Sequence, residues 1–448
     1  MNRDRFFSAS TAAINKQIIR LTVPNIVSNI TVPLLGMVDL AMMGRLNSPV
    51  FIGAVALGTV IFNMLYLSLG FLRMGTTGFT AQASGAGNNH EISYTLYRAL
   101  TIAMLIALSF IIFQKPIEWI AYQLLDGDKE VKLLALKYFR IRILAAPATL
   151  ALYVLMGWFI GMQNTLIPMI ISVAVNVLNI GFNILFVLGF HMQVEGVAWG
   201  TLLAQYGGVI IGLVFLLVKY RSVLIKPALQ LILQKAPMRK FLSINTDILI
   251  RSILLLVALS FFTSKSAIFG NDVLAINAIF LQFFFFFSYF MDGFAYAGEA
   301  MAGNLFGAKQ ATGLQKLTWL LFGWGIAVSL VFSLVYLFFG HWLVGLLTDI
   351  DSVSAQAYHY YFWMVFIPLS TFAAFIWDGI YVGVTAAKAM RNTMIIAVLG
   401  VFFPAYFLLT GVFDNHGIWL AFHLFMLARG ISMTFFARKA IFRPMLVK

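Results

Sequence analysis

Asp39 places an ionisable carboxyl group among apolar neighbours in the stretch PLLGMVDLAMMGRL. Burying a charge is costly, so a carboxyl group kept in such a stretch indicates a function. At 100° per residue, the polar and helix-bending residues before it share its face within an arc of about 120°; they are Asn25, Asn29, Pro33 and Gly36. Pro33 cannot donate to the carbonyl of Asn29, so the helix can bend there. The pattern predicts a proton or cation site at Asp39, the alternative being a carboxyl group that only hydrogen-bonds within the protein.

Three asparagines further along the chain repeat this theme. Asn176, Asn179 and Asn183 lie within an arc of about 60° on one helix. If that helix neighbours the first one, their amides can hydrogen-bond Asp39. The alternative is polar packing between helices with no direct role.

The second half of the chain carries an acid and a base one helical turn apart. In SINTDILIRS, Asp247 precedes Arg251 by four residues, a spacing at which opposite charges can pair on one helix. Such a pair also lowers the cost of keeping both groups in an apolar setting. The sequence leaves open whether the two residues are a structural pair or act directly.

Further acidic residues occur in apolar stretches of the second half. Asp292 and Glu299 share one helix face, and Asp378 shares another with Tyr381. Asp378 is the second functional candidate, with a structural role as the alternative. For Glu299 the alternative is an exposed charge near the end of its helix.

The chain lacks several short motifs that mark nucleotide-binding, metal-binding and hydrolase sites. It has no GxxxxGK[ST] phosphate loop, no HExxH, no GxSxG and no cysteine, and its six histidines are scattered. We therefore expect no enzyme, no cofactor and no metal site. Any work that the protein does would draw on an ion gradient or on a partner.

The composition indicates that lipid is the solvent of this chain. It has 448 residues, of which 61% are hydrophobic and 10% charged, and its mean hydropathy is +0.92. A soluble domain has about 25% charged residues. The net charge of +14 would suit nucleic acid in a soluble protein, but here most basic residues fall in short loops between apolar runs, as the positive-inside rule describes.

The apolar runs predict an all-α polytopic membrane protein with about twelve transmembrane helices. Three segments of the chain are basic. They are the N-terminal tail with Arg3 and Arg5, the acid-free stretch KYRSVLIKPALQLILQKAPMRK, and the C-terminal tail ending at Lys448. Six helices separate each basic segment from the next, so all three can be cytoplasmic. The runs begin at about residues 18, 52, 93, 133, 166, 194, 241, 272, 317, 355, 393 and 417.

A shift of 222 residues pairs small residues of the two halves. It aligns Gly85 with Gly307, Gly157 with Gly379, and Gly161 with Gly383. Because six helices is an even number, the repeats are expected to be parallel and related by a pseudo-two-fold axis along the membrane normal. The predicted division is an N-terminal six-helix bundle at 1–218, a basic cytoplasmic linker at 219–240 and a C-terminal six-helix bundle at 241–448.

Several stretches, in this order, resemble the multidrug and toxic compound extrusion (MATE) family, most closely its DNA-damage-inducible protein F (DinF)-like branch. They include TVPNIVSNI, VDLAMMGRL, GFTAQASGAG, NVLNIGFNILFVLGF, NTDILIRS, MDGFAYAGEAMAGNLFGAKQ and WDGIYVGVTAAKAMRN. The resemblance covers nearly the whole chain. It implies two six-helix bundles in a V and a secondary antiporter that expels cationic or amphipathic organic compounds in exchange for H⁺ or Na⁺.

The resemblance also implies roles for individual residues. Asp39 matches the first-helix carboxylate implicated in ion coupling, and Asn179 matches an asparagine of the same cavity. Asn183 stands where many relatives carry an aspartate, which puts a two-carboxylate site in doubt. The positions that match charged residues of the DinF-like C-terminal half are Asp247, Arg251, Asp292, Glu299 and Asp378.

The resulting expectation is a monomeric, multi-pass protein of the bacterial cytoplasmic membrane, with both termini in the cytoplasm. Its partners would be small organic compounds and the lipid bilayer, without nucleic acid. A flippase for lipid-linked precursors, from the wider superfamily, is the alternative within transport, although such proteins often have extra helices or an arginine-lined cavity. An intramembrane enzyme or a structural membrane protein is the alternative from another class.

Overall fold

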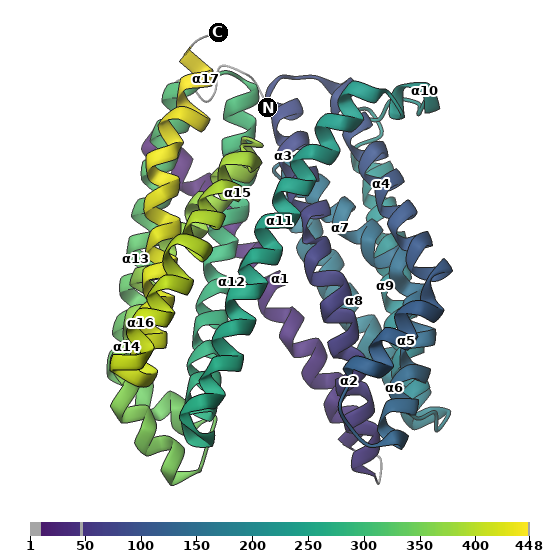
Figure 1. Cartoon of the computed structure of the whole chain (residues 1–448). Helices are drawn as coiled ribbons and strands as arrows, with labels where there is room; N and C mark the ends of the chain where they lie inside the picture. Colours follow the sequence, from purple (N-terminus) through teal and green to yellow (C-terminus); the bar gives the residue numbers. More distant parts are fainter. Residues whose placement is uncertain (1–9, 45–47, 447–448) are drawn as a thin grey trace. The chain divides into compact units, whose positions relative to one another are not determined.

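The structure is a computed structural model that describes residues 10–44 and 48–446. Over these residues the chain is built from helices and contains no strand (Figure 1). The predicted all-α architecture is therefore confirmed. Arg3, Arg5 and Lys448, which contributed to the predicted orientation, lie outside the described residues.

The helices follow one another with short connections, and short 3-10 or π segments continue several of them. In chain order they are α1 (Thr11–Gly44), α2 (Pro49–Leu67), α3 (Phe71–Gly85), α4 (Asn89–Ile112), α5 (Gln114–Leu124), α6 (Lys129–Arg142), α7 (Ala146–Gly161), α8 (Leu166–Asn183), α9 (Val194–Lys219), α10 (Leu229–Ile232), α11 (Lys235–Ser266), α12 (Asn271–Gly307), α13 (Ala311–Gly345), α14 (Asp351–Gly383), α15 (Ala387–Ile395), α16 (Phe403–Ala437) and α17 (Arg443–Leu446).

Eleven helical segments of the described residues are long and apolar enough to cross a membrane. The last of them, Ala387–Met445, is 59 residues long, well over twice the roughly 20 residues that one span needs. Its backbone leaves the helical conformation at Asp414, where φ is 48°. This break divides the segment into two spans, which gives the predicted twelve.

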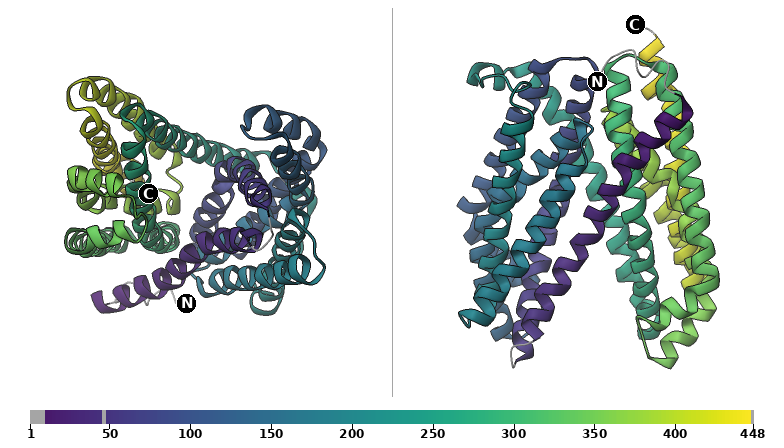
Figure 2. Two further views of the ribbon diagram at one scale, coloured as in Figure 1. Left: turned by 90° about the horizontal axis from the view of Figure 1, so that it is seen from below. Right: turned by 180° about the vertical axis from the view of Figure 1, so that it is seen from behind.

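Contacts divide the chain into two compact units. Unit 2 is Val27–Phe241, and unit 1 combines the described residues up to Ile26 with those from Leu242 onward. The helix α1 belongs to both, because it runs as one element from Thr11 to Gly44 and continues through Pro33 (Figure 2). The predicted boundaries at 218 and 241 differ from this division mainly in the first helix, and the bundle assignment stays a prediction.

The two halves repeat the same close helix packing at the predicted shift. In α7, a Cβ on Gly157 would lie 2.4 Å from the carbonyl oxygen of Arg73 in α3. In α14, a Cβ on Gly379 would lie 2.2 Å from the carbonyl oxygen of Ala295 in α12. Arg73 and Ala295 are themselves 222 residues apart. Each half therefore needs glycine at the same place, where one helix backbone packs directly on another.

The helix ends repeat as well. Left-handed backbone follows α3 at Gly87 (φ 67°) and α12 at Lys309 (φ 58°). It also follows α7 at Gln163 (φ 56°) and α14 at Thr385 (φ 54°). Both pairs are 222 residues apart, and at each site the turn closes through N–H groups that donate to carbonyls of the last helical turn. The repeat extends from sequence to backbone conformation.

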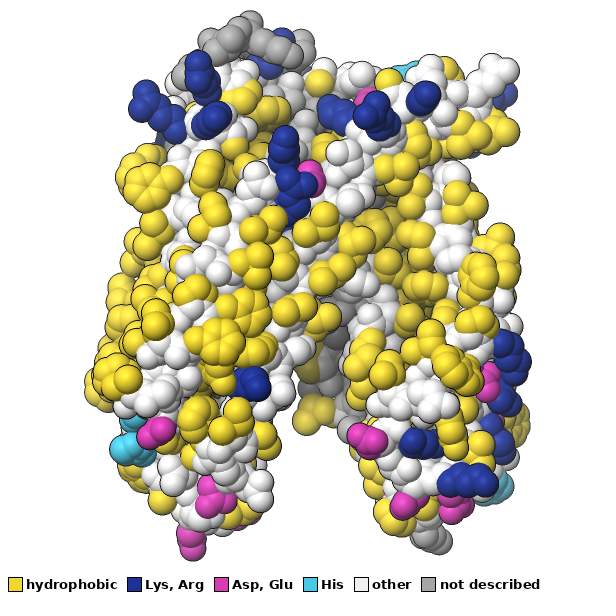
Figure 3. Space-filling model, in the orientation of Figure 1, with side chains coloured by type: hydrophobic (Ala, Val, Ile, Leu, Met, Phe, Trp, Pro, Cys, Tyr) yellow, Lys and Arg dark blue, Asp and Glu magenta, His cyan; other side chains and the backbone are white. Residues whose placement is uncertain are grey.

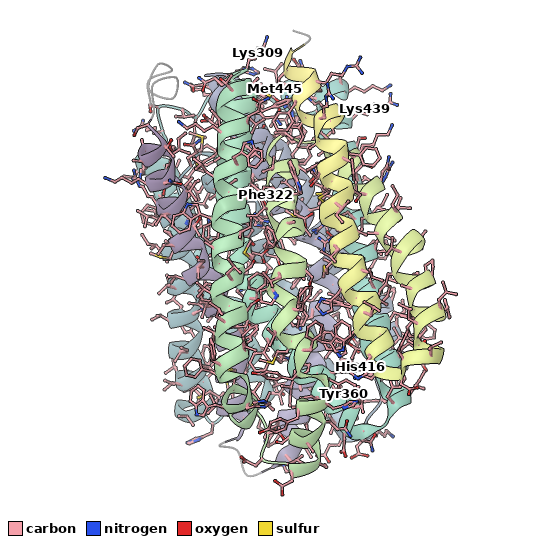
Figure 4. All side chains as sticks on the ribbon, turned by 90° about the vertical axis from the view of Figure 1, so that its left-hand side faces the viewer. Lys309, Phe322, Tyr360, His416, Lys439 and Met445 are labelled. Carbon is pink, nitrogen blue, oxygen red and sulfur yellow. The ribbon has the colours of Figure 1, made fainter. Side chains whose placement is uncertain are left out.

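Apolar side chains cover the outside of each unit over most of its length, as expected for a surface that faces lipid (Figure 3). In unit 1, most Lys and Arg side chains of the face in view gather at the end that holds α17. Most of the acidic and histidine side chains of this face lie toward its opposite end. Figure 4 shows the same polarity, with Lys309 and Lys439 at one end and Tyr360 and His416 at the other.

Candidate functional site

Asp39 and the asparagines of α8 come together in the interior of unit 2. Asp39 is 7% exposed, and its Oδ1 accepts a hydrogen bond of 2.7 Å from Nδ2 of Asn183. The two residues are 144 positions apart, so the contact joins α1 to α8. The prediction that the fifth apolar run supplies an amide to Asp39 is therefore confirmed for Asn183.

A chain of hydrogen bonds extends from Asp39 into α9. The same Nδ2 of Asn183 donates to Oδ1 of Asn179 at 3.0 Å, and Nδ2 of Asn179 donates to Oγ1 of Thr201 at 3.0 Å. A Cβ on Gly200 would lie 2.1 Å from Oδ1 of Asn183, so α9 approaches α8 closely enough for these groups to meet. Asn179, Asn183 and Thr201 are at most 2% exposed. The network holds the Asp39 carboxyl group in one orientation.

Asn176 of α8 and Asn25 of α1 make hydrogen bonds outside this network. Nδ2 of Asn176 donates to the carbonyl oxygen of Thr31 at 3.1 Å, which ties α8 to α1 beside the site. Nδ2 of Asn25 donates to the carbonyl oxygen of Leu21 at 2.9 Å within its own helix, and Asn25 belongs to unit 1. Asn29 is half-buried and Pro33 is exposed. Of the polar face predicted on α1, Asp39 joins the asparagine network through Asn183.

Arg142, at the end of α6, was not among the predicted site residues. It is half-buried, donates from Nη1 to the phenol oxygen of Tyr138, and interacts electrostatically with Asp39. Its guanidinium carbon lies 4.8 Å from the ring centroid of Phe62 and 5.4 Å from that of Tyr138. The signal in the sequence was an arginine well inside the apolar segment Lys129–Gly161.

In unit 1, Asp378 is held between two arginines from other helices. Arg429 of α16 donates from Nη2 to Oδ2 of Asp378 at 2.8 Å, and Arg251 of α11 donates from Nη2 to the same oxygen. The side chains of Asp378, Arg251 and Arg429 are 9%, 10% and 2% exposed. Arg429 also interacts electrostatically with Asp292, which brings the charges of this cluster into balance.

The pairing of Asp247 with Arg251 on one helix is corrected by these contacts. Arg251 pairs with Asp378, and Oδ1 of Asp247 instead accepts from Nη1 of Arg391 in α15 at 2.5 Å. Both partners are more than 120 residues away in sequence, beyond what helix periodicity can predict. Arg391 and Arg429 were missed for the same reason.

Tyr381 and Glu299 lie deep in the packing of unit 1. Tyr381 has no exposed surface, and its hydroxyl donates to the carbonyl oxygen of Met433 at 2.6 Å. Glu299 is 2% exposed, so the alternative of an exposed charge is wrong. Its carbonyl oxygen would lie 2.4 Å from a Cβ on Gly383, in the same close packing of α14 on α12. Among the described residues, no three His, Asp or Glu side chains come together as metal ligands would.

Comparison with known proteins gives a consistent result. A family model described as MatE matches residues 24–185 and 248–408, one stretch in each half of the chain. DNA damage-inducible protein F of Escherichia coli is 37% identical over 430 residues, covering 94% of this chain and 91% of the relative. The multidrug resistance protein NorM of Vibrio cholerae is 27% identical over 172 residues, covering 38% of this chain and 37% of the relative.

The fold is also that of a solved transporter structure. The Vibrio cholerae MATE transporter VcmN in the bent form superimposes with a TM-score of 0.86 and covers 98% of this chain and 99% of its own. The two sequences are 20% identical, so this likeness concerns the fold alone.

Proposed function

The chain belongs to the MatE family of membrane transporters, and within it we propose a proton-coupled antiporter that exports amphipathic organic compounds by alternating access. The family makes the protein a multi-pass transporter rather than an enzyme. The observation that carries the proposal is the buried carboxyl group of Asp39, held by Asn183 in the interior of unit 2. An ionisable group in a membrane span is costly to keep, and one that faces the bundle interior is suited to carrying a proton.

The surroundings of Asp39 favour a proton over sodium as the coupling ion. Hard cations bind several oxygen ligands, but Asn183 presents its NH₂ group to Asp39 rather than its oxygen. A proton needs neither several ligands nor space.

Exchange requires that the proton and the substrate compete for the same group, so that binding of one displaces the other. A cationic group of the substrate would bind ionised Asp39 and compete with the proton. Binding of either one must favour a different facing state of the transporter, since a ligand with equal affinity for both states shifts nothing. Protonation from one side and substrate release to that side then follow one another in a cycle.

Purified protein in liposomes tests the choice of ion. A fluorescent cation is loaded on one side, and an opposing proton gradient or sodium gradient is imposed in separate experiments. We expect the proton gradient to drive uptake of the dye and the sodium gradient to have no effect. Asp39→Asn should abolish driven transport, whereas Asp272→Asn, which neutralises an exposed acid of unit 1, should leave it unchanged. Transport driven by sodium alone, or unchanged by Asp39→Asn, would contradict the proposal.

Location and assembly follow from the same proposal. We place the protein as a monomer in the bacterial cytoplasmic membrane with both termini cytoplasmic, which the Lys and Arg residues of the predicted cytoplasmic segments support. Because the chain has no cysteine, single cysteines added at Lys439 and at Asp351 can be labelled with an impermeant maleimide in whole cells. Only the cysteine at 351 should react from outside.

A flippase for lipid-linked precursors remains the second candidate, because Arg142 places an arginine in the interior of unit 2. Such a substrate carries phosphate groups that arginine binds well. Flipping of a fluorescent polyprenyl-phosphate across liposomes without an ion gradient would favour it over the antiporter.

A further inference from the structure

Arg142 is a charged residue in the interior of unit 2 that the proposed proton exchange does not use directly. Arg98 of unit 2, like Arg251 and Arg429 of unit 1, contacts a carboxylate at ion-pair distance. Arg142 makes no such ion pair among the described residues; its contacts are a phenol oxygen and two aromatic rings. A guanidinium group has five N–H donors, so most of its hydrogen-bonding capacity is left over.

The charges of Asp39 and Arg142 are near one another but held apart. Asp39 accepts from Asn183 on the α8 side, and Arg142 donates to Tyr138 on its own helix. They still interact electrostatically. Each charge is thus oriented by a neutral partner, and the two groups interact electrostatically without a direct ion pair between them.

Aromatic rings line the position of the guanidinium group. Phe62 lies under Arg142 and stacks on Tyr66, with ring centroids 5.5 Å apart and planes at 30°. Phe62 also stacks on Phe139, at 5.5 Å and 27°. These rings are at most 9% exposed, so they hold the guanidinium group in place rather than offer a face to a ligand. A guanidinium group binds carboxylates through two parallel hydrogen bonds.

We propose that Arg142 determines substrate specificity by binding an acidic group of the substrate, so that the preferred class is organic zwitterions rather than simple cations. The cationic group of such a compound faces Asp39, and its carboxylate faces Arg142. This inference rests on the Asp39 site of the proposed function and adds a second contact point to it.

Linkage between the two charges explains why a zwitterion suits an antiporter. The cationic group competes with the proton for Asp39, which is the condition for exchange. A purely anionic compound bound at Arg142 would instead favour protonation of Asp39, and proton and substrate would move together. A compound with both charges keeps the exchange and adds the interaction with Arg142.

Two dyes that differ in one group test the proposal. Rhodamine 110 carries a free carboxylate, and rhodamine 123 is its methyl ester, so the ester is a cation of nearly the same shape. Equilibrium binding of each to purified protein in lipid nanodiscs is measured by fluorescence anisotropy at pH 8. We expect the wild-type protein to bind the acid about tenfold more tightly than the ester, the size of one charge-assisted contact.

Variants at two arginines of α6 test whether Arg142 causes the preference for the acid over the ester. Arg142→Gln should weaken binding of the acid to the level of the ester and change the affinity for the ester less than twofold. Arg142→Lys, which keeps the charge without the planar fork, should retain part of the preference. Arg140→Gln, on the same helix but bound to Glu118, should leave the ratio of the two affinities unchanged.

The outcomes separate this inference from the proposed function. Equal affinities of the two dyes in the wild-type protein, or an unchanged ratio in Arg142→Gln, would overturn the role of Arg142. The wild-type ratio needs no variant, so the proposal can fail even if Arg142→Gln does not fold. If the ratio is as expected but no proton gradient drives transport of the ester, the antiport mechanism fails while the specificity of the site stands.

Discussion

The charge cluster of Asp378, Arg251 and Arg429 predicts that Asp378 stabilises unit 1 rather than exchanging ions. Both guanidinium groups donate to its Oδ2, and the three side chains are at most 10% exposed. Removing one partner from a buried ion pair leaves an uncompensated charge and costs about 3–5 kcal/mol. We therefore expect Asp378→Asn to lower the free energy of unfolding by about 3–5 kcal/mol.

A compensating substitution makes the prediction sharper. Arg251→Met combined with Asp378→Asn removes one charge of each sign and leaves Arg429 with Asp292, its remaining electrostatic partner. Replacing a buried ion pair by apolar groups is often nearly neutral. The double variant should therefore lie within about 1–2 kcal/mol of the wild-type protein, well above the single variant.

Unfolding in mixed micelles of increasing SDS content, followed by tryptophan fluorescence, measures these free energies. Proton-driven dye transport is then compared at equal amounts of folded protein. Asp272→Asn is the matched control, because it changes an exposed acid of the same unit. The reasoning is refuted if Asp378→Asn unfolds like the wild-type protein, or if the double variant is as unstable as the single one.

Two further predictions concern the repeat and pH. Gly157→Ala and Gly379→Ala should each destabilise the protein by about 1–3 kcal/mol, because the added Cβ would meet a backbone carbonyl at 2.4 Å or 2.2 Å; a thermal midpoint that moves for one and not for the other would contradict their equivalence. Hydrogen bonds from Arg140 hold the pKa of Glu118 below its usual value. The contribution of this ion pair to the stability of the folded protein is therefore present above the unfolded pKa of Glu118 and is lost as pH falls through its folded pKa. Glu118→Gln should lower the thermal midpoint near pH 7, by a free energy of at most about 1 kcal/mol, and leave it unchanged at a pH below the folded pKa of Glu118.

Much of the fold could be predicted from the sequence because lipid imposes simple rules. Each span must be apolar and about 20 residues long, so the spans are visible in one dimension. The duplication was visible because close helix packing needs glycine at matching places, such as Gly157 and Gly379. Asn183 could be linked to Asp39 because both interrupt long apolar faces.

The charge partners of the second half could not be predicted in the same way. Helix periodicity relates residues within one helix, so it suggested that Asp247 pairs with Arg251 one turn away. In the structure, Asp247 pairs with Arg391 and Arg251 pairs with Asp378. Each partner comes from another helix, so tertiary packing determines the pairs. Tyr381 shares a helix face with Asp378, yet α14 is enclosed by neighbouring helices there, so a polar face marks internal packing as readily as a cavity.

The central claim, that substrate and proton compete for Asp39, is tested most directly by counting protons released on binding. Purified protein in weakly buffered detergent solution at a pH where Asp39 is protonated is mixed with saturating rhodamine 123, and a pH indicator dye reports the release. The account predicts about one proton per bound dye for the wild-type protein and none for Asp39→Asn that binds the dye. Dye binding without proton release in the wild-type protein, or the same release from Asp39→Asn, would contradict it.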